Sequence, residues 1–240
     1  MTASWRHLVM LSYDIDPDIL MPMVPTGTQL DMWNGRCFVS LVGFMFEDSR
    51  LCGVPIPFHG SFEEVNLRFY VKRVAEGETR RAVVFIKELV PKRAVAMVAK
   101  MLYSEPYLAL PMSHEHEKNE GRDLQSAVYR WTHNRQECEI GIEVDSPMAL
   151  PDIGSIEEFI AEHYWGYTRL DDTKTAEYRV THPQWRVARA ERAWRKCDAA
   201  SLYGEQFEAC LAAKPVSAFL ADGSEIAVFP RKVLRGAELR

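Results

Sequence analysis

Polar residues at every second position of one segment could form a binding site for an organic acid. From Phe62 to Val71 polar and apolar residues alternate, as is typical of a β-strand with one apolar face. Glu64, Asn66 and Arg68 therefore point to the same side, about 7 Å apart along the strand. Inside a barrel, Arg68 could bind a carboxylate through two hydrogen bonds while Asn66 supports it. On a solvated face the same residues would form an ion-pair ladder, and the sequence leaves both alternatives open.

Glu88 is a candidate acid or base. It lies on a strand expected from Arg80 to Val90, where alternation places it on the same face as Ala82, Val84 and Ile86. A carboxyl group buried beside small apolar side chains has a raised pKa, so it could shuttle a proton or orient a ligand. The alternative is a side chain at the strand end that reaches solvent or pairs with a basic residue.

Lys92 is a candidate nucleophile. It follows Pro91, where we expect a helix to begin, and it precedes Arg93. A lysine amine attacks a carbonyl group only when neutral, so its pKa must fall from about 10.4 toward neutrality. The charge of Arg93 and the positive end of the helix dipole would both favour that fall. The alternative is a solvated lysine in the first turn of a surface helix.

The segment His114-Glu115-His116 raises the question of a metal site. In a strand the two histidines would share a face, but the flanking sequence offers no identifiable third ligand. We therefore interpret them as solvated histidines of a polar loop, and we predict neither a metal nor a cofactor.

The elements that must position these residues are mostly short strands. Val65, Leu67 and the alternating residues after them predict the clearest strand, and about ten strands with three to five short helices favour a closed antiparallel barrel. The other expected elements are a short helix capped by Asp16, a hairpin around His133–Arg135, a helix from Ile156 to Tyr164 capped by Ser155, helices at Arg189–Cys197 and Leu202–Ala213, and a final hairpin turn at Asp222-Gly223.

Composition sets further bounds. The chain has 240 residues and a formal net charge of −5, with acidic and basic residues mixed, so a nucleic-acid partner is not expected. Five scattered cysteines without metal or redox spacing fit a reducing compartment, and no apolar run could span a bilayer. We expect a soluble, cytoplasmic protein without a membrane partner.

Several segments carry a resemblance to a known family. They include Trp5-Arg6-His7-Leu8, Glu63 to Val71, and His182-Pro183-Gln184-Trp185. In this order they resemble the uncharacterised YqjF-like branch of the acetoacetate-decarboxylase superfamily, from Trp5 to Phe229. The resemblance implies a mainly β (α+β) fold, an acetoacetate-decarboxylase-like closed antiparallel β-barrel with a few short peripheral helices, with residues 1–240 as one domain.

The resemblance also bears on the site. In acetoacetate decarboxylase an arginine at the Arg6 position faces the active-site cavity, and a glutamate at the Glu88 position precedes the Schiff-base lysine. Here Pro91-Lys92-Arg93 follows Glu88 two residues sooner, so an ungapped alignment puts Ala94 at the lysine position. Only a two-residue deletion brings Lys92 there.

Two functions remain open on the sequence. One is a protein that binds or converts a small organic (oxo-)acid in a central cavity, with Glu88 and Lys92 as catalytic candidates. Its substrate-binding candidates are Arg6, Glu64, Asn66, Arg68 and Tyr107. As an enzyme it would be a lyase, either a decarboxylase or an aldol-type enzyme. The other is a non-catalytic binding or interaction module that kept the barrel. The oligomeric state stays open, and surplus aromatics such as Trp5, Trp33, Trp165, Trp185 and Trp194 are candidates for a subunit interface.

Overall fold

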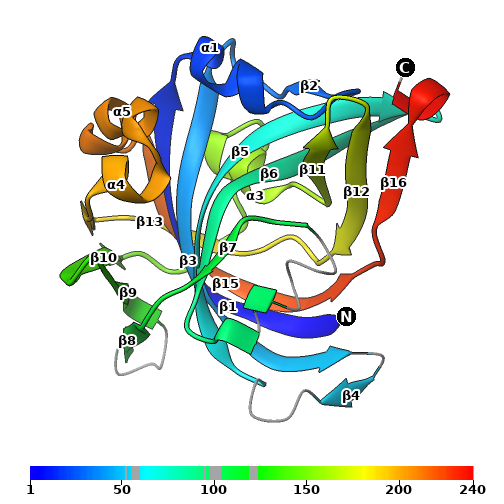
Figure 1. The fold of residues 1–240 in the computed structure, drawn as a ribbon. Helices are drawn as coiled ribbons and strands as arrows, with labels where there is room; N and C mark the ends of the chain where they lie inside the picture. Colours follow the sequence, from blue (N-terminus) through cyan, green and yellow to red (C-terminus); the bar gives the residue numbers. More distant parts are fainter. Residues whose placement is uncertain (52, 56–59, 95, 98–103, 119–123, 240) are drawn as a thin grey trace.

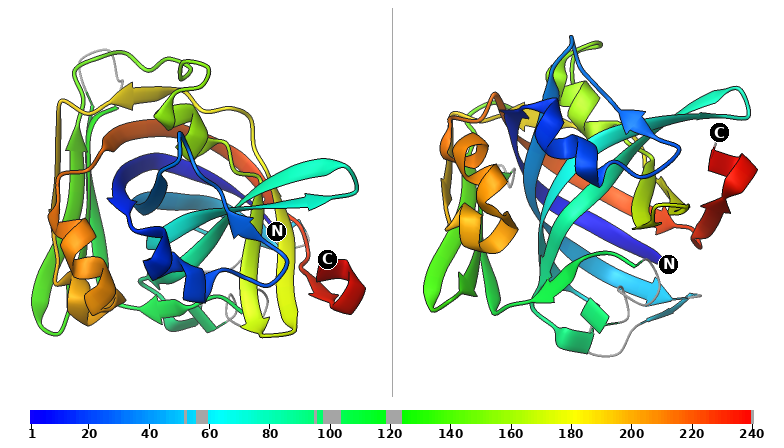
Figure 2. Two further views of the ribbon diagram at one scale, coloured as in Figure 1. Left: turned by 90° about the horizontal axis from the view of Figure 1, so that it is seen from above. Right: turned by 45° about the horizontal axis from the view of Figure 1, so that its top comes forward.

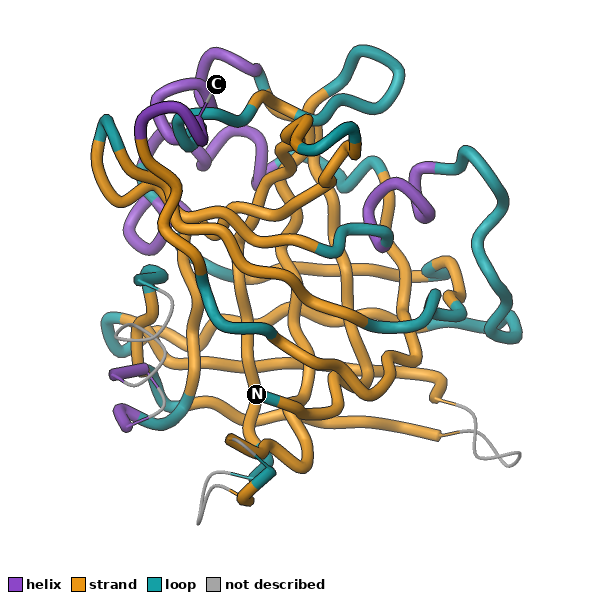
Figure 3. The backbone as a smooth tube through the Cα atoms, turned by 90° about the vertical axis from the view of Figure 1, so that its right-hand side faces the viewer, coloured by secondary structure: helices purple, strands orange, loops and turns teal. Residues whose placement is uncertain are grey.

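The structure is a computed structural model that describes residues 1–51, 53–55, 60–94, 96–97, 104–118 and 124–239. Its architecture is mainly β, with a few short helices at the edges of the strand array (Figures 1 and 3). The strands are β1 (Thr2–Ile15), β2 (Gln29–Leu30), β3 (Cys37–Leu51), β4 (Val54–Pro55), β5 (Phe62–Ala75), β6 (Glu78–Val90), β7 (Tyr107–Ala109), β8 (Met112–Lys118), β9 (Leu124–His133), β10 (Gln136–Glu143), β11 (Trp165–Asp171), β12 (Lys174–Thr181), β13 (Val187–Arg189), β14 (Arg192–Lys196), β15 (Ser217–Val228) and β16 (Lys232–Arg235). The α-helices are α1 (Pro17–Leu20), α3 (Ile156–Ala161), α4 (Ala199–Tyr203) and α5 (Glu208–Ala212), and 3-10 turns cover Met21–Met23, Glu205–Phe207 and Gly236–Leu239.

Seven strands close into a ring. The order β15-β1-β3-β5-β6-β11-β12 is completed by pairing of β12 with β15, where Val180 faces Val228. Figure 2 shows this ring from above in its left view. The predicted mainly β fold with a ring of strands is confirmed. One seam differs from a purely antiparallel barrel, because β6 and β11 pair in parallel.

A second sheet, in the order β14-β10-β9-β8, packs on the outside of the ring. Gly43 on β3 makes this close approach possible, since a Cβ atom there would lie 2.7 Å from the ring of Tyr129 and 2.8 Å from the side chain of Ile140. Buried residues of both sheets and of α4 and α5 form one core cluster. A second cluster lies inside the ring and includes Leu8, Met10 and Phe44. The ring interior is therefore a separate compartment, and it holds the candidate site.

Local sequence signals account for several elements. Asp16 caps α1, because its side chain accepts a hydrogen bond from the backbone N–H of Asp18. Ser155 caps α3 in the same way, although that helix ends at Ala161 rather than at Tyr164. The hairpin of β9 and β10 turns through Asn134 and Arg135, both at positive φ, as expected for a tight two-residue turn.

Two of the elements expected from the sequence are absent from the structure. The segment Arg189–Cys197 is not helical: it contains the end of β13 and all of β14, and it pairs with the edge of β10. Pairing along the sheet edge therefore outweighs its helical propensity. Asp222-Gly223 is also no hairpin turn but the middle of the continuous strand β15. Gly223 has φ +75° and pairs with Arg6 of β1, and a Cβ there would lie 2.0 Å from the Trp5 carbonyl oxygen.

The helix expected after Pro91 falls largely on residues 95 and 98–103, outside the described residues.

Candidate functional site

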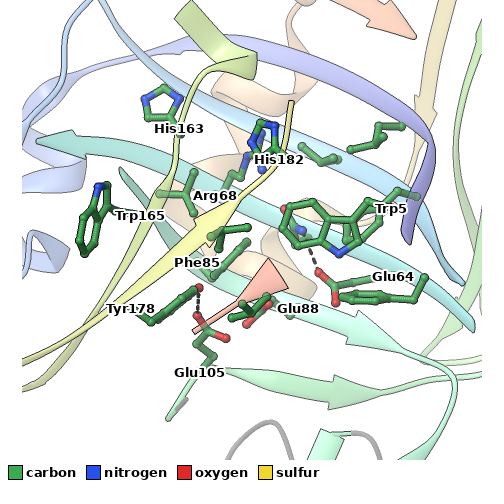
Figure 4. Close-up of a pocket in the computed structure, with 18 of the residues that line it drawn as sticks. Trp5, Glu64, Arg68, Phe85, Glu88, Glu105, His163, Trp165, Tyr178 and His182 are labelled. Atoms are coloured by element: carbon green, nitrogen blue, oxygen red, sulfur yellow. Dashed lines mark hydrogen bonds between the residues drawn. The ribbon is translucent and has the colours of Figure 1, made fainter. Parts of the chain in front are cut away.

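A cavity of about 70 Å³ lies inside the ring (Figure 4). Its wall is largely aromatic and aliphatic, with a small number of polar groups. Trp5, Trp165 and Trp185 line this wall, so the cavity accounts for three of the tryptophans that the sequence left unplaced. Few polar groups in a mainly apolar concave site are the usual composition of a small-molecule pocket.

The polar face of β5 supplies one side of the cavity. Glu64, Asn66 and Arg68 all line it, and their exposed fractions are 2%, 1% and 8%. The opposite face of the strand, including Val65 and Leu67, is buried in the other core cluster. The predicted alternation is present, and of the two alternatives the structure has the sheltered face, not the solvated one.

Glu88 also lines the cavity, but on a different face from the predicted one. The pairing of β5 with β6 shifts between Leu67 opposite Lys87 and Arg68 opposite Phe85, which leaves Ile86 as an inserted residue. This β-bulge reverses the facing of the strand. As a result Glu88 shares the cavity side with Val83 and Phe85, not with Ala82, Val84 and Ile86, which pack in the other cluster.

Neighbouring strands bring a third carboxyl group to the same place. Asn66 and Glu88 are direct partners across β5 and β6, and Glu88 is in turn the partner of Tyr107 on β7. Glu105 lies just before β7, is 4% exposed, and accepts a hydrogen bond from the Tyr178 hydroxyl of β12. Three carboxyl groups, of Glu64, Glu88 and Glu105, therefore line one cavity.

Burial shifts all three carboxyl groups toward their protonated forms. It raises the pKa of Glu64 to about 7, although hydrogen bonds from Asn66 and Tyr107 oppose the shift. The pKa of Glu105 rises to about 8, mainly through burial and despite the bond from Tyr178. Burial, together with the negative charges of Glu105 and Glu64, raises the pKa of Glu88 well above its ordinary value. Near neutral pH this wall can hold or release protons.

Arg68 brings a positive charge to the cavity, and no described residue neutralises it in a salt bridge. Among the described residues no carboxylate lies within 4.0 Å of its guanidinium nitrogens. Its buried Nε atom has no hydrogen-bond partner there either. A buried arginine without a paired anion is unusual, because the uncompensated charge is costly to remove from water.

Two histidines accompany Arg68 (Figure 4). His163 is 7% exposed and lies 3.6 Å from Asp31, which also accepts a 2.8 Å hydrogen bond from Arg81. Burial lowers the pKa of His163 to about 4, and burial also lowers the pKa of His182. His182 is stacked against Trp185 at 4.2 Å between ring centroids. Both rings are therefore neutral hydrogen-bonding groups at neutral pH.

The sequence-derived candidates divide into two groups. Five of them line the cavity: Glu64, Asn66, Arg68, Glu88 and Tyr107. Arg6 does not, since it lines an open surface groove and donates a 3.3 Å hydrogen bond to the Gly223 carbonyl. Lys92 does not line the cavity either, and no lysine does so among the described residues. Ala94 is exposed.

Sequence reasoning missed four polar residues of the cavity, namely Glu105, His163, Tyr178 and His182. Tyr178 lies on β12 between the charged residues Glu177 and Arg179, and this alternation could have signalled an inward-facing hydroxyl. Glu105 and His163 lie outside regular strands, so no periodicity could have assigned their direction.

The histidines of His114-Glu115-His116 lie on strand β8, not in a loop. The rings of His114 and His116 are 4.8 Å apart, and His116 lies 4.4 Å from the ring of His7. His114 contacts Glu63 at 2.7 Å. Even so, within the described part of the chain no three His, Cys, Asp or Glu side chains have an arrangement that could hold a metal ion.

None of the described helices is both long enough and apolar enough to cross a membrane.

Comparison with solved structures identifies proteins of similar fold. One similar structure is the enduracididine biosynthesis enzyme MppR in complex with the condensation product of pyruvate and imidazole 4-carboxaldehyde. The structural match covers 98% of this chain and 89% of the MppR chain, with a TM-score of 0.68 and 12% sequence identity. Acetoacetate decarboxylase from Legionella pneumophila is also similar: the match covers 97% of this chain and 86% of the decarboxylase chain, with a TM-score of 0.66 and 12% sequence identity. At such identities the likeness shows a shared acetoacetate-decarboxylase-like fold.

Sequence comparison gives the family. Uncharacterized protein YqjF of Bacillus subtilis is 28% identical over 116 residues, which are 48% of this chain. The match spans 46% of YqjF, about half of that relative's length. The model of the DUF2071 family, described as an uncharacterized conserved protein, matches residues 2–225. The chain therefore belongs to the DUF2071 family.

Proposed function

We propose that the protein binds or converts a small organic acid, such as an oxo-acid, in the ring cavity, with Arg68 holding its carboxylate. The observation that carries this proposal is the buried guanidinium of Arg68, which lines the cavity without an ion-pair partner among the described residues. A ligand carboxylate would supply the missing negative charge through charge-assisted hydrogen bonds. Neutral His163 and His182 line the same cavity as Arg68.

The size of the cavity limits the ligand. One water needs about 10–15 Å³ on the same measure, so about 70 Å³ has room for about five to seven water-sized groups. Short oxo-acids with a single carboxylate fall in this range. The fold neighbours support this class, since one solved structure of MppR is a complex with pyruvate.

Glu88 is the proposed acid or base. Its Oε2 atom has no hydrogen-bond partner among the described residues, and burial raises the pKa of its carboxyl group, which favours the protonated form. A protonated carboxyl group can donate to the oxo oxygen of a ligand and stabilise negative charge that develops there. This step uses no amine nucleophile, in keeping with the position of Lys92 outside the cavity wall.

The second candidate function is ligand binding without chemistry. It is favoured by the same observation on Lys92, because no described lysine reaches the cavity to form an imine. In either case we propose a cytoplasmic location. The free thiols of Cys37, Cys138, Cys197 and Cys210 support it, since such thiols persist in reducing compartments.

A binding screen tests the proposal. Pyruvate, 2-oxobutyrate, acetoacetate and butyrate are titrated calorimetrically into wild type, Arg68→Gln and the exposed control Arg50→Gln on β3. We expect binding that weakens about 10- to 100-fold in Arg68→Gln and is unchanged in Arg50→Gln. Equal affinities for wild type and Arg68→Gln would refute the carboxylate site. Proton NMR of each bound acid over time then separates an enzyme, which consumes the acid, from a binding protein, which does not.

A further inference from the structure

We propose that the ligand also carries a nitrogen cation with N–H donors, at the end opposite its carboxylate. The inference rests on the proposed function and narrows its ligand to a short amino acid or guanidino acid. It concerns the wall formed by Asn66 and the three carboxyl groups of Glu64, Glu88 and Glu105, which we call the acidic wall (Figure 4).

The acidic wall contains two buried oxygen atoms without a hydrogen-bond partner among the described residues. Asn66 donates through Nδ2 to Glu64 Oε1 at 3.0 Å, which leaves its Oδ1 atom without a partner among the described residues. Glu88 Oε2 is also without a partner there. Asn66 and Glu88 are each 1% exposed and are direct cross-strand partners, so both atoms belong to the same part of the wall. A buried oxygen without a hydrogen-bond partner destabilises the protein, and a ligand donor would recover that loss.

An oxo group alone does not complete this wall. A carbonyl oxygen is itself an acceptor, so it could take a proton from Glu88 but would leave Asn66 Oδ1 unpaired. An ammonium or guanidinium group carries several donors and can reach both atoms. The geometry of the acceptors therefore favours a nitrogen group over an oxygen group at this end.

The charges around the acidic wall also favour a cationic group on the ligand. None of the described arginines or lysines lies within ion-pair distance of Glu64, Glu88 or Glu105. Their hydrogen bonds come from neutral groups: Asn66 and Tyr107 for Glu64, and Tyr178 for Glu105. A cation here would favour the ionised carboxylates and lower their raised pKa values, so its binding should release protons to solvent.

The spacing of the two ends sets the length of the ligand. Asn66 and Arg68 are two residues apart on one strand face, which separates them by about 7 Å. A carboxylate at Arg68 and a cation at Asn66 are then joined by two or three methylene groups. β-Alanine and 4-aminobutyrate have this form. Both are small enough for a cavity with room for about five to seven water-sized groups.

Isosteric ligand pairs test the inference on the wild-type protein. Butyrate replaces the ammonium of β-alanine by a methyl group, and pentanoate does the same for 4-aminobutyrate. We expect each amino acid to bind at least about 10-fold more tightly than its isostere. Calorimetry at pH 7 in two buffers of different ionisation enthalpy should show proton release for the amino acids only.

A variant locates the effect. Glu88→Gln keeps the shape of the side chain and removes its charge, while Glu78→Gln changes an exposed residue of the same strand. The preference for the amino acids should shrink several-fold in Glu88→Gln and persist in Glu78→Gln. Circular dichroism confirms that each variant is folded, and the wild-type comparison stands even if Glu88→Gln is not.

The outcomes separate the two proposals. If butyrate binds as tightly as β-alanine and Arg68→Gln weakens both, the carboxylate site stands and the cation inference is wrong. If neither pair binds while an oxo-acid of the screen does, the cation inference is wrong and the carboxylate site stands. If no acid binds at all, or if Arg68→Gln leaves the binding of every acid unchanged, the proposed function itself fails.

Discussion

Asn66 and Glu88 face each other directly across β5 and β6, and each has one buried oxygen without a hydrogen-bond partner among the described residues. The pair exists because a bulge at Ile86 turns Glu88 toward the ring interior. Without that inserted residue Glu88 would face the opposite core, and the cavity would lose one of its three carboxyl groups. A local irregularity of one strand thus creates the acidic wall.

Replacement of Glu88 should change how stability depends on pH. The folded protein raises the pKa of Glu88 above its unfolded value, so its contribution is fully present below about pH 4.5 and is lost as pH rises through the folded pKa. Glu88→Gln cannot ionise, so it escapes that loss. We expect urea denaturation to show the variant more stable than wild type by on the order of 1–3 kcal/mol at pH 8, with a smaller difference at pH 5. Glu78→Gln serves as the control, and an equal difference at both pH values would argue against a buried, protonated Glu88.

Lys92 should be dispensable for ligand binding. It does not line the cavity, and its backbone carbonyl accepts a 3.1 Å hydrogen bond from the Ala96 N–H. We expect Lys92→Ala to bind the acids of the screen with wild-type affinity. Borohydride added to the protein with acetoacetate should give no mass adduct. A stoichiometric adduct that disappears in Lys92→Ala would instead establish imine chemistry at this lysine.

The histidine cluster of β1 and β8 should destabilise the protein in acid. Burial, followed by neighbouring positive charges, lowers the pKa of His7 to about 4 and that of His116 to about 3. Both pKa values lie below the unfolded value of about 6.5, so stability falls as pH drops from 6.5 toward 4. His116→Gln should reduce this loss by on the order of 1 kcal/mol, after allowance for the partial exposure of the ring. The measurement is the unfolding free energy at pH 7 and pH 4.5, and an unchanged pH dependence would count against the cluster.

Glu177 should be a major structural ion-pair centre. It is 5% exposed and accepts hydrogen bonds from Arg80 at 3.0 Å and from the Tyr167 hydroxyl at 2.7 Å, with Arg73 at 3.4 Å. Removal of its charge leaves buried arginines uncompensated, so Glu177→Gln should cost about 3–5 kcal/mol in denaturant unfolding.

The control for this effect is Glu76→Gln. Glu76 is a second ion-pair partner of Arg80, and its own side chain is 86% exposed. It should cost less than about 1 kcal/mol. Similar costs for the two variants would show that burial of Glu177 adds nothing.

The sequence predicted the facing of a site residue only where polar and apolar residues alternate regularly along an unbroken strand. Alternation in Phe62–Val71 was enough to place Glu64, Asn66 and Arg68 on one face, because an unbroken strand keeps its facing. That this face is the sheltered one follows only from the ring of strands. The same reasoning failed for Glu88, since an inserted residue on β6 is invisible to alternation. Glu105 and Tyr178 meet only through the ring of strands, which is a property of the whole fold.

The role of Arg68 in the cavity is tested most directly by a crystal structure of the protein with the tightest-binding acid of the screen. We predict electron density for the ligand inside the ring, with its carboxylate oxygens about 3 Å from the guanidinium of Arg68. A carboxylate bound instead at Arg6 in the surface groove, with no ligand in the cavity, would contradict the proposed site.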